Sequence, residues 1–420
     1  MGTPHQSASR FPGFDGLRLL AAVSVIFSHA FLLATGSEAT EPLVRLLGPG
    51  NIFGLYGVFT FFIISGFLLA RSLSANPQPI TYAVNRTLRI LPGFLFCIAL
   101  TAFVLGPAFS QMPLRDYSSR ADVGTFLRMS ISTLGDWPLP GVFAYKGAYA
   151  TVANGSLWSL HYEALSYILL LVFWMSLRSH TLVAAAGSLL TLLVWCSPVV
   201  AKRIPSVAYT LPYFSAGVAM SWFQAKYGTR RLGAVISALG LIIAAAYGLQ
   251  AYAFAIFGAY LVVYFAERKN AGSKIALAIG DCSYGLYLFG WPAEQVVKQL
   301  TGTESALALF LLATPLAFLL ALLSYHAVEK PTINARAPVA ALISRGLSKV
   351  FGARPGYASA GAKLGFIVMA TFILTAKSRW WYFFESLGLI ILAASVGGGI
   401  ARLCSGFVFP GRASMSRTRT

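Results

Sequence analysis

Charge is scarce in this chain of 420 residues: 11% of them are charged, whereas 57% are hydrophobic. A soluble core of this size does not need so apolar a sequence, so the composition argues against an ordinary soluble globular protein. Acidic residues are the scarcer kind, with 13 Asp and Glu against 32 Lys and Arg. In a membrane protein a basic excess is typical of cytoplasmic loops. Because the sequence has no basic soluble module, we expect no nucleic-acid binding.

Cysteine is equally sparse, and its spacing excludes the common metal motifs. The four cysteines, Cys97, Cys196, Cys282 and Cys404, lie far apart in or beside apolar segments. They form no CxxC pair and no Cys/His pattern with the spacing of metal ligands. We interpret them as small packing residues and expect no metal site.

A signal-peptide cleavage site is also missing near the N-terminus. Residues 1–33 carry Arg10 and Arg18 before an apolar stretch, as signal peptides do, but no clear small-residue cleavage site follows. Cleavage would also remove Arg18 and His29. We therefore favour a retained helix that anchors the chain in a membrane.

Long apolar runs are what the chain has in abundance. They are about 17–24 residues long, enough for a helix to cross a hydrocarbon core of about 30 Å. We predict an all-α, polytopic transmembrane helical bundle with ten core spans, followed by one or two C-terminal membrane segments. The predicted core spans cover residues 17–35, 52–70, 90–108, 157–177, 181–199, 207–224, 232–248, 251–266, 282–300 and 305–327.

The loops between these spans predict the orientation of the chain. Basic residues gather in alternate loops, which include Arg178, Arg231 and Arg268, whereas the opposite side carries Lys202 and Arg203 and a long loop of mixed charge. Because Lys and Arg favour the cytoplasmic side, we predict a cytoplasmic N-terminus. The sequence shows no internal repeat.

We divide the chain into residues 1–333 as a transmembrane domain, residues 334–363 as a basic cytoplasmic linker, and residues 364–420 as an extension with a basic tail. Two apolar runs, 364–376 and 380–400, make the extension either a hairpin or one span preceded by an interfacial helix. The outer loop 111–154 is rich in Pro, Gly, Ser and Asp. A loop of this length is either a lid or binding surface, or a plain connector.

Arg18 and His29 are the most informative polar residues of the first span. Eleven residues separate them, which is three helical turns to within about 20°, so both side chains lie on one face, about 16 Å apart along the axis. Ionisable groups inside a membrane helix are costly and usually face a cavity or a partner. Asp15 lies one turn before Arg18. His29 suits general-base chemistry near neutral pH, and the alternative is a satisfied core histidine.

Depth in the membrane suggests a partner for His29. Entering from the cytoplasm, His29 lies about 18 Å along the first span, and Glu163, entering from the other side, lies about 9 Å deep. Both positions are roughly two thirds across, so Glu163 could orient the imidazole and stabilise its charged form. The alternative for Glu163 is a structural ion pair, and His161 is a weaker candidate.

Arg86 and Arg89 form an R-x-x-R pair just before the third span, with Pro92 in its first turn. Residues three apart are neighbours on a helix, so the two guanidinium groups could clamp a phosphate. The alternative is cytoplasmic anchoring.

Two further stretches combine small and aromatic residues. Residues 54–66 favour close packing over a substrate path. Residues 281–292 contain a Gly/Pro break of the kind that lines cavities.

Taken in order, these segments resemble the acyltransferase-3 family of integral membrane acyltransferases, from about Phe14 to Pro331. The resemblance rests on FDGLR ending at Arg18 with ten residues before His29, the run from Gly57 to Ser65-Gly66-Phe67, RTLRILP over 86–92, SLWSLHYE over 156–163, SYGLY over 283–287, and EKP over 329–331. Proteins of this family O-acylate bacterial surface glycans and related acceptors. The resemblance therefore implies a multi-pass protein of the bacterial inner membrane.

The resemblance also implies roles for individual residues. The family's activity motif falls on Arg18 and His29, and its donor-handling motif falls on Arg86 and Arg89. From its depth in the membrane we add Glu163 to the expected catalytic residues. The residues expected to line the site are Asp15, Ser65, Trp158, Tyr284 and Tyr287. Many members carry a histidine where this chain has Gly290, so a second catalytic histidine is not expected there. Some members carry an SGNH-type domain, and we expect none in this sequence.

From the residues and the resemblance together we expect a membrane-bound O-acyltransferase. Acyl-CoA, with acetyl-CoA as the leading candidate, would be a co-substrate, and no permanently bound cofactor is expected. Its phosphates would meet the arginines, and His29 would deprotonate a hydroxyl of a lipid-linked or exported glycan such as lipopolysaccharide O-antigen, exopolysaccharide or capsule. Membrane lipid and the glycan are the other expected partners. The alternatives are a secondary transporter with a His29–Glu163 proton relay, which no repeat supports, and an inactive scaffold.

Overall fold

The computed structural model describes residues 11–351 except for 12, 120, 134, 136–137, 140, 144–148, 150–151, 198–199, 201–204, 269–273 and 275–279. Within this part of the chain the fold is all-helical and contains no β-strand, only an isolated bridge between Ser110 and Val142. The predicted fold class is thereby confirmed as all-α. The predicted extension 364–420 lies outside the described residues.

The helices are α1 Phe14–Thr35, α2 Pro42–Leu47, α3 Phe53–Ala75, α4 Pro79–Leu100, α5 Gly106–Phe109, α6 Leu114–Ser119, α7 Ala121–Thr133, α8 Leu160–Leu177, α9 His180–Cys196, α11 Pro205–Ala208, α12 Leu211–Tyr227, α13 Arg231–Ala246, α14 Gln250–Ala253, α15 Ala259–Ala266, α17 Ser283–Thr301, α18 Ala306–Ser324, α19 Lys330–Asn334 and α20 Arg336–Phe351. Single π-helical turns continue three of them, at Thr101–Leu105, Phe254–Gly258 and Tyr325–Glu329. A 3₁₀ turn, Gly155–Ser159, leads into α8.

Each of the ten predicted spans contains helix, but not every helix is long and apolar enough to cross a membrane. Among the described residues five meet both conditions: Phe14–Thr35, Phe53–Ala75, Pro79–Phe109, Gly155–Leu177 and Ala306–Asn334. Shorter apolar helices cover His180–Cys196, Arg231–Ala246 and Gln250–Ala266. The structure therefore supports several membrane spans, and the count of ten stays a prediction.

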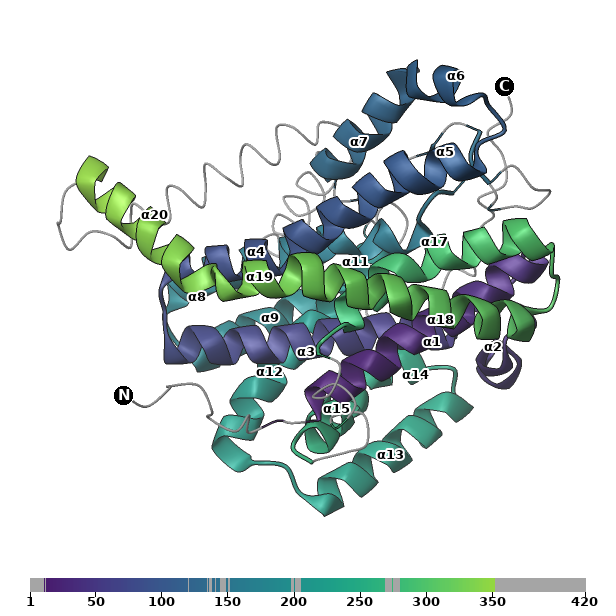
Figure 1. Ribbon diagram of the computed structural model, residues 1–420. Helices are drawn as coiled ribbons and strands as arrows, with labels where there is room; N and C mark the ends of the chain where they lie inside the picture. Colours follow the sequence, from purple (N-terminus) through teal and green to yellow (C-terminus); the bar gives the residue numbers. More distant parts are fainter. Residues whose placement is uncertain are drawn as a thin grey trace.

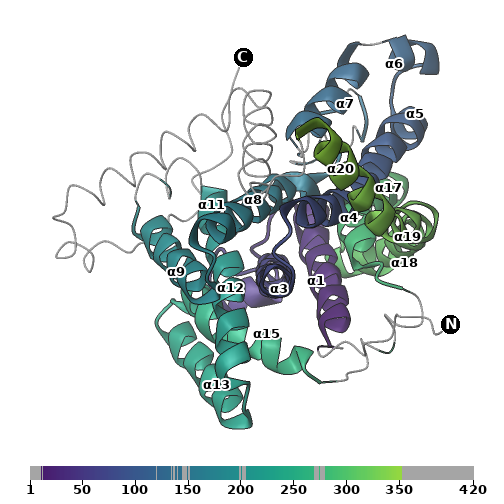
Figure 2. The same ribbon diagram turned by 90° about the vertical axis from the view of Figure 1, so that its left-hand side faces the viewer.

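Helix α3 lies near the middle of the bundle, with α1 and α12 packed against it (Figure 2). Glycines make these contacts close. A Cβ added at Gly57 would come within 2.6 Å of the Ala21 carbonyl oxygen on α1, and one at Gly66 within 2.0 Å of the Phe214 carbonyl oxygen on α12. Small residues let helix backbones approach this closely, so the packing interpretation of this stretch is supported.

Helices α17 and α18 lie side by side and both contact α1 (Figure 1). Pro292 lies inside α17, where it has no N–H to donate to the carbonyl of Leu288, four residues earlier. The side-chain amide of Asn154 donates to this carbonyl oxygen instead, at 2.8 Å. The helix therefore continues through the proline, and the residues before α8 satisfy the backbone group that the break sets free.

Two regions of the sequence that looked irregular contain helices. The outer loop 111–154 includes α6 and α7, and the linker 334–363 begins with α20. Figure 1 shows α20 beside the first turns of α4, and the contacts between these two helices agree with the picture. Helix α20 is therefore placed next to Arg86 and Arg89 of α4, a position that bears on the site described below.

Candidate functional site

A cavity of about 80 Å³ lies among α1, α3, α4, α8 and α17. Its wall brings together most of the predicted site residues from segments far apart in the sequence. They are Arg18, Ser65, Arg86, Arg89, Glu163, Tyr284 and Tyr287. Tyr167, Ser159, Ser283 and several apolar side chains complete the wall, whereas Asp15, Trp158 and His29 are not part of it.

Five charged groups contact one another at the edge of this cavity. Asp281, which sequence reasoning left without a role, binds the guanidinium of Arg89, and its Oδ2 lies 3.8 Å from Nη1 of Arg18. Arg18 also contacts Asp15, with Nη1 3.4 Å from Oδ1. Glu329 Oε2 lies 3.7 Å from Nη1 of Arg89. The network ties α1, α4, the start of α17 and the end of α18 together.

The Asp281 carboxylate is stabilised by the cations around it. Burial alone would raise the pKa of Asp281, but the charges of Arg89 and Arg18 outweigh burial and lower its pKa to about 2. A hydrogen bond from Ser283 Oγ, at 2.6 Å, acts in the same direction. Asp281 is therefore ionised at any physiological pH.

Glu163 lines the cavity but does not have the partner expected for it. It accepts hydrogen bonds from the hydroxyl of Tyr167, one turn further along α8, and from Ser65 Oγ of α3 at 3.3 Å. The predicted pairing of Glu163 with His29 is therefore wrong. Helix α8 faces α3, so Glu163 is directed toward this helix and not toward His29 on α1.

The structure gives His29 a different carboxylate, Glu294 of α17. His29 Nδ1 lies 3.8 Å from Glu294 Oε2, and the ring of Trp291 packs edge-on against the imidazole with centroids 4.8 Å apart. The distance is short enough for an ion pair but too long for a hydrogen bond. Within the described residues, neither Glu294 oxygen nor His29 Nδ1 has a hydrogen-bond partner. The Glu294 side chain is fully buried, whereas His29 keeps 13% of its side-chain surface accessible.

Glu294 could have been found from the sequence, because it is a carboxylate in the middle of a predicted membrane span. Such a residue marks a functional site by default. Its spacing from Tyr287, Trp291 and Tyr284 is also helical, so these four residues share one face of α17. Glu294 lies seven residues past Tyr287, which is about 10 Å along the helix. One face of α17 thus runs from the cavity wall to the partner of His29.

Hydrogen bonds fix this face of α17 in place. Tyr284 Oη donates to the carbonyl oxygen of Ile90 at 2.9 Å, and Tyr287 Oη donates to that of Ser156 at 2.6 Å. Trp291 Nε1 donates to the carbonyl oxygen of Val152 at 3.0 Å. Gln295 Nε2 also bonds this carbonyl, at 2.8 Å. The last residues of the outer loop are therefore fastened to α17 beside His29.

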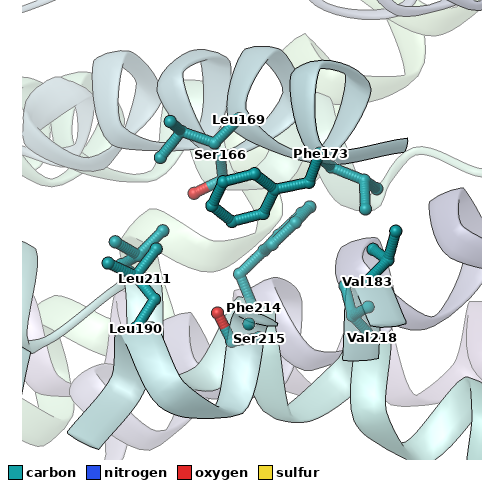
Figure 3. A pocket seen from close by; sticks show the side chains of 11 residues that line it. Ser166, Leu169, Phe173, Val183, Leu190, Leu211, Phe214, Ser215 and Val218 are labelled. Atoms are coloured by element: carbon teal, nitrogen blue, oxygen red, sulfur yellow. The ribbon is translucent and has the colours of Figure 1, made fainter. Parts of the chain in front are cut away.

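A second cavity, between α8, α9 and α12, has none of the predicted site residues (Figure 3). Its volume is about 20 Å³, and its wall is apolar except for Ser166 and Ser215. Phe173 and Phe214 face each other across it in Figure 3. With no titratable side chain in its wall, this cavity offers no acid–base chemistry.

Metal binding has no structural support within the described residues, where no group of three or more His, Cys, Asp or Glu side chains is placed to hold an ion. The absence of a metal centre stays a prediction for the whole chain. Gly290, where a histidine was considered, packs against α1: a Cβ there would lie 2.7 Å from Ile26 Cγ1.

Comparisons with known proteins give a family match and several relatives. A family model described as an acyltransferase domain, Acyl_transf_3, matches residues 11–326. An O-acetyl transferase of Shigella phage Sf6 is 26% identical over 348 residues, covering 77% of this chain and 97% of the relative. A membrane-bound transacylase named BcsY, from Komagataeibacter xylinus, is 25% identical and covers 82% of this chain and 89% of its own length. Nodulation protein 10 of Rhizobium leguminosarum bv. viciae is 37% identical over 101 residues, 24% of this chain and 26% of the relative. No solved structure matches.

Proposed function

This chain belongs to the acyltransferase-3 family of membrane acyltransferases, and from this premise we propose that it moves an acyl group, as an O-acetyltransferase, from cytoplasmic acyl-CoA to a hydroxyl of a bacterial surface or exported glycan. The observation that carries the proposal is the His29–Glu294 pair. His29 is on α1 and Glu294 is on α17, and both helices also contribute residues to the wall of the cavity that holds the arginines. The name of the phage relative supports acetyl as the transferred group.

The donor end of the site is the cavity with Arg18, Arg86 and Arg89. Guanidinium groups bind phosphate oxygens through two parallel hydrogen bonds, which suits the pyrophosphate of a coenzyme A thioester. Arg89 is neutralised by Asp281 and Glu329, whereas Arg86 forms no ion pair within the described residues, and its Nε is buried without a partner. Arg86 is therefore the cation most in need of an anion.

The chemical end is His29. With Nδ1 facing Glu294, the other ring nitrogen, Nε2, is left to take the proton of the acceptor hydroxyl. The oxygen of this hydroxyl attacks the thioester carbonyl carbon, and the C–S bond breaks as the tetrahedral intermediate collapses. The imidazolium returns its proton to the leaving thiolate, so the products are an ester and free coenzyme A. Glu294 stabilises the imidazolium that forms between these steps.

The two ends are separated along the helices, and the donor has the shape to bridge them. Arg18 and His29 are eleven residues apart on α1, about 16 Å along its axis. The pantetheine arm is the part of the donor that spans this distance, and it passes Tyr287, which lines the cavity and lies one turn before Trp291 on α17. An intermediate with the acyl group on His29 is an alternative route to the same products.

The proposal includes the setting of the enzyme. Ten core spans with a cytoplasmic N-terminus, in the bacterial inner membrane, put Arg86 and Arg89 on the side where acyl-CoA is made. The bias of Lys and Arg toward the predicted inner loops supports this orientation. His29 then lies nearer the face at which exported glycans are found.

Mass spectrometry of surface glycans tests this function. A surface glycan should carry an acyl group in cells with the gene and lack this group in cells without it. The difference in mass between the two glycans identifies the acyl group. Cells complemented with His29→Ala should match the deletion, while cells with His326→Ala, which alters an exposed histidine, should match the wild type. Identical glycans with and without the gene would contradict the proposal.

A further inference from the structure

Arg336 is the first residue of α20 and lies past the stretch matched by the family model, which ends at residue 326. Helix α20 packs against α4, the helix that carries Arg86 and Arg89. Arg336 does not form part of the cavity wall, whereas Arg86 and Arg89 do. A fourth guanidinium, after those of Arg18, Arg86 and Arg89, therefore lies beside the donor end of the site, just outside the cavity.

The surroundings of Arg336 are unfavourable for an arginine without a ligand. Nε and Nη2 of Arg336 and Nε of Arg86 are buried and have no hydrogen-bond partner within the described residues. Buried donors without partners cost stability. Burial and the like charges of Arg86 and Arg89 lower the pKa of Arg336 to about 10. The guanidinium still carries its charge near pH 7, so the repulsion is present in the folded protein.

The carboxylates nearby do not relieve this repulsion. Asp281 binds Arg89 and Arg18, and Glu329 lies beside Arg89. In the described part of the chain, no carboxylate lies within ion-pair distance of Arg336 or Arg86. Glu163 lines the same cavity wall as Arg86 but lies beyond ion-pair distance of it. The donors of Arg336 and Arg86 that have no partner form a binding site for an anion, and a phosphate monoester suits it best because it carries close to two negative charges at pH 7.

We propose that Arg336 and Arg86 form a subsite for a phosphate monoester and that the ligand is the 3′-phosphate on the adenosine of the acyl-CoA donor. The assignment rests on the proposed function. In coenzyme A the 3′-phosphate is the charged group farthest from the thioester. It therefore lies outermost when the thioester points toward His29, and Arg336 lies outside the cavity wall. Helix α20 thereby adds donor recognition to the domain that the family model covers.

Competition binding distinguishes this subsite from the rest of the donor site. Purified full-length protein in nanodiscs of neutral phosphatidylcholine is titrated with coenzyme A and with dephospho-coenzyme A, which lacks only the 3′-phosphate. The wild type should bind coenzyme A about tenfold more tightly or better, as expected for charge-assisted hydrogen bonds. In Arg336→Gln the ratio should fall toward one, with any remaining preference due to Arg86, while the affinity for dephospho-coenzyme A stays unchanged.

Two further variants make the comparison specific. Arg345→Gln removes an exposed cation of the same helix and should keep the full preference for coenzyme A. Arg336→Lys keeps the charge but loses the planar fork, so an intermediate ratio is expected. Unchanged binding of dephospho-coenzyme A shows that each variant is folded.

Four outcomes would overturn the subsite. A wild type that does not discriminate between the two ligands would show that no 3′-phosphate subsite exists. An Arg336→Gln variant that keeps the full wild-type preference would show that Arg336 does not bind this phosphate. Both results leave the proposed donor unaffected. If Arg336→Gln instead abolishes a difference between nanodiscs with and without anionic phosphatidylglycerol, the anion is a lipid headgroup. A protein that binds neither form of coenzyme A contradicts the proposed function together with the subsite.

Discussion

The two ends of the interface between α1 and α17 differ in how their charges are satisfied. At the Arg18 end, Arg18, Arg89, Asp281 and Glu329 contact one another in a network. At the His29 end, within the described residues, His29 and Glu294 have only each other, at 3.8 Å and without a hydrogen bond. Paired charges hold helices together, whereas a buried carboxylate without hydrogen bonds costs stability. The contrast indicates a structural and binding role for one end and a chemical role for the other.

The largest expected effect on activity comes from Glu294, the buried carboxylate at the His29 end. Glu294→Gln keeps the shape of the side chain but removes the charge that stabilises the imidazolium. We expect the rate of acyl transfer at saturating acyl-CoA to fall about 100-fold, with the KM for acyl-CoA within twofold. Steady-state kinetics of the purified protein measures both constants.

The same variant should not lose stability, because the change relieves the desolvation cost of a buried carboxylate. Its unfolding temperature in detergent should equal or exceed that of the wild type. Glu304→Gln, which alters an exposed carboxylate just past the end of α17, is the matched control and should change neither property. A rise in KM with an unchanged maximal rate would place Glu294 in donor binding and remove the contrast between the two ends.

Asp281 should behave in the opposite way. Asp281→Asn leaves Arg18 and Arg89 without their shared anion, so we expect the free energy of unfolding to fall by about 2 kcal/mol. Chemical denaturation in detergent measures this loss, and Asp116→Asn, at an exposed aspartate of α6, is the control. Unchanged stability in Asp281→Asn would show that the network at the Arg18 end contributes nothing to the fold.

The pH dependence of stability gives a second measure of the same network. Arg89 and Arg18 lower the pKa of Asp281 to about 2 in the folded protein, below its ordinary value of 3.8. The stabilisation is therefore fully present above about pH 5 and is lost as the pH falls from about 4 toward 2. The difference in unfolding free energy between the wild type and Asp281→Asn should shrink over this range. A difference that stays constant down to pH 2 would contradict the assigned pairing.

The smallest effect is expected at Glu163, which the sequence put forward as the partner of His29. In the structure Ser65 and Tyr167 bind this carboxylate, and it lines the cavity near the arginines. Glu163→Gln should therefore raise the KM for acyl-CoA a few-fold and leave the maximal rate within about threefold. If Glu163→Gln were to reduce the maximal rate more than Glu294→Gln does, the original pairing would have to be restored.

Local patterns in the sequence predicted the parts of this site that depend on one helix at a time. The helical character of the spans and the grouping of Arg86 with Arg89 follow from spacing alone. In the structure Arg18, Ser65, Glu163, Tyr284 and Tyr287 line one cavity with these arginines, although Glu163 was expected at the depth of His29.

The partner of His29 was missed because it depends on which helices meet. Depth counted along each span placed Glu163 level with His29, but the structure places Glu163 in the cavity with Arg18, Arg86 and Arg89, where Ser65 of α3 bonds it. Glu294 is instead on α17, which packs against α1. Helix crossings are set by side-chain packing over whole interfaces, and a single sequence does not specify them.

Single-turnover acyl transfer with purified protein tests the central claim, that His29 is the base at which the thioester and the hydroxyl meet. Wild type and His29→Ala are mixed with labelled acyl-CoA and acceptor glycan after both are shown to bind coenzyme A equally. The account predicts rapid transfer of the label by the wild type and transfer reduced at least about 100-fold in His29→Ala. Transfer by His29→Ala at the wild-type rate would contradict it.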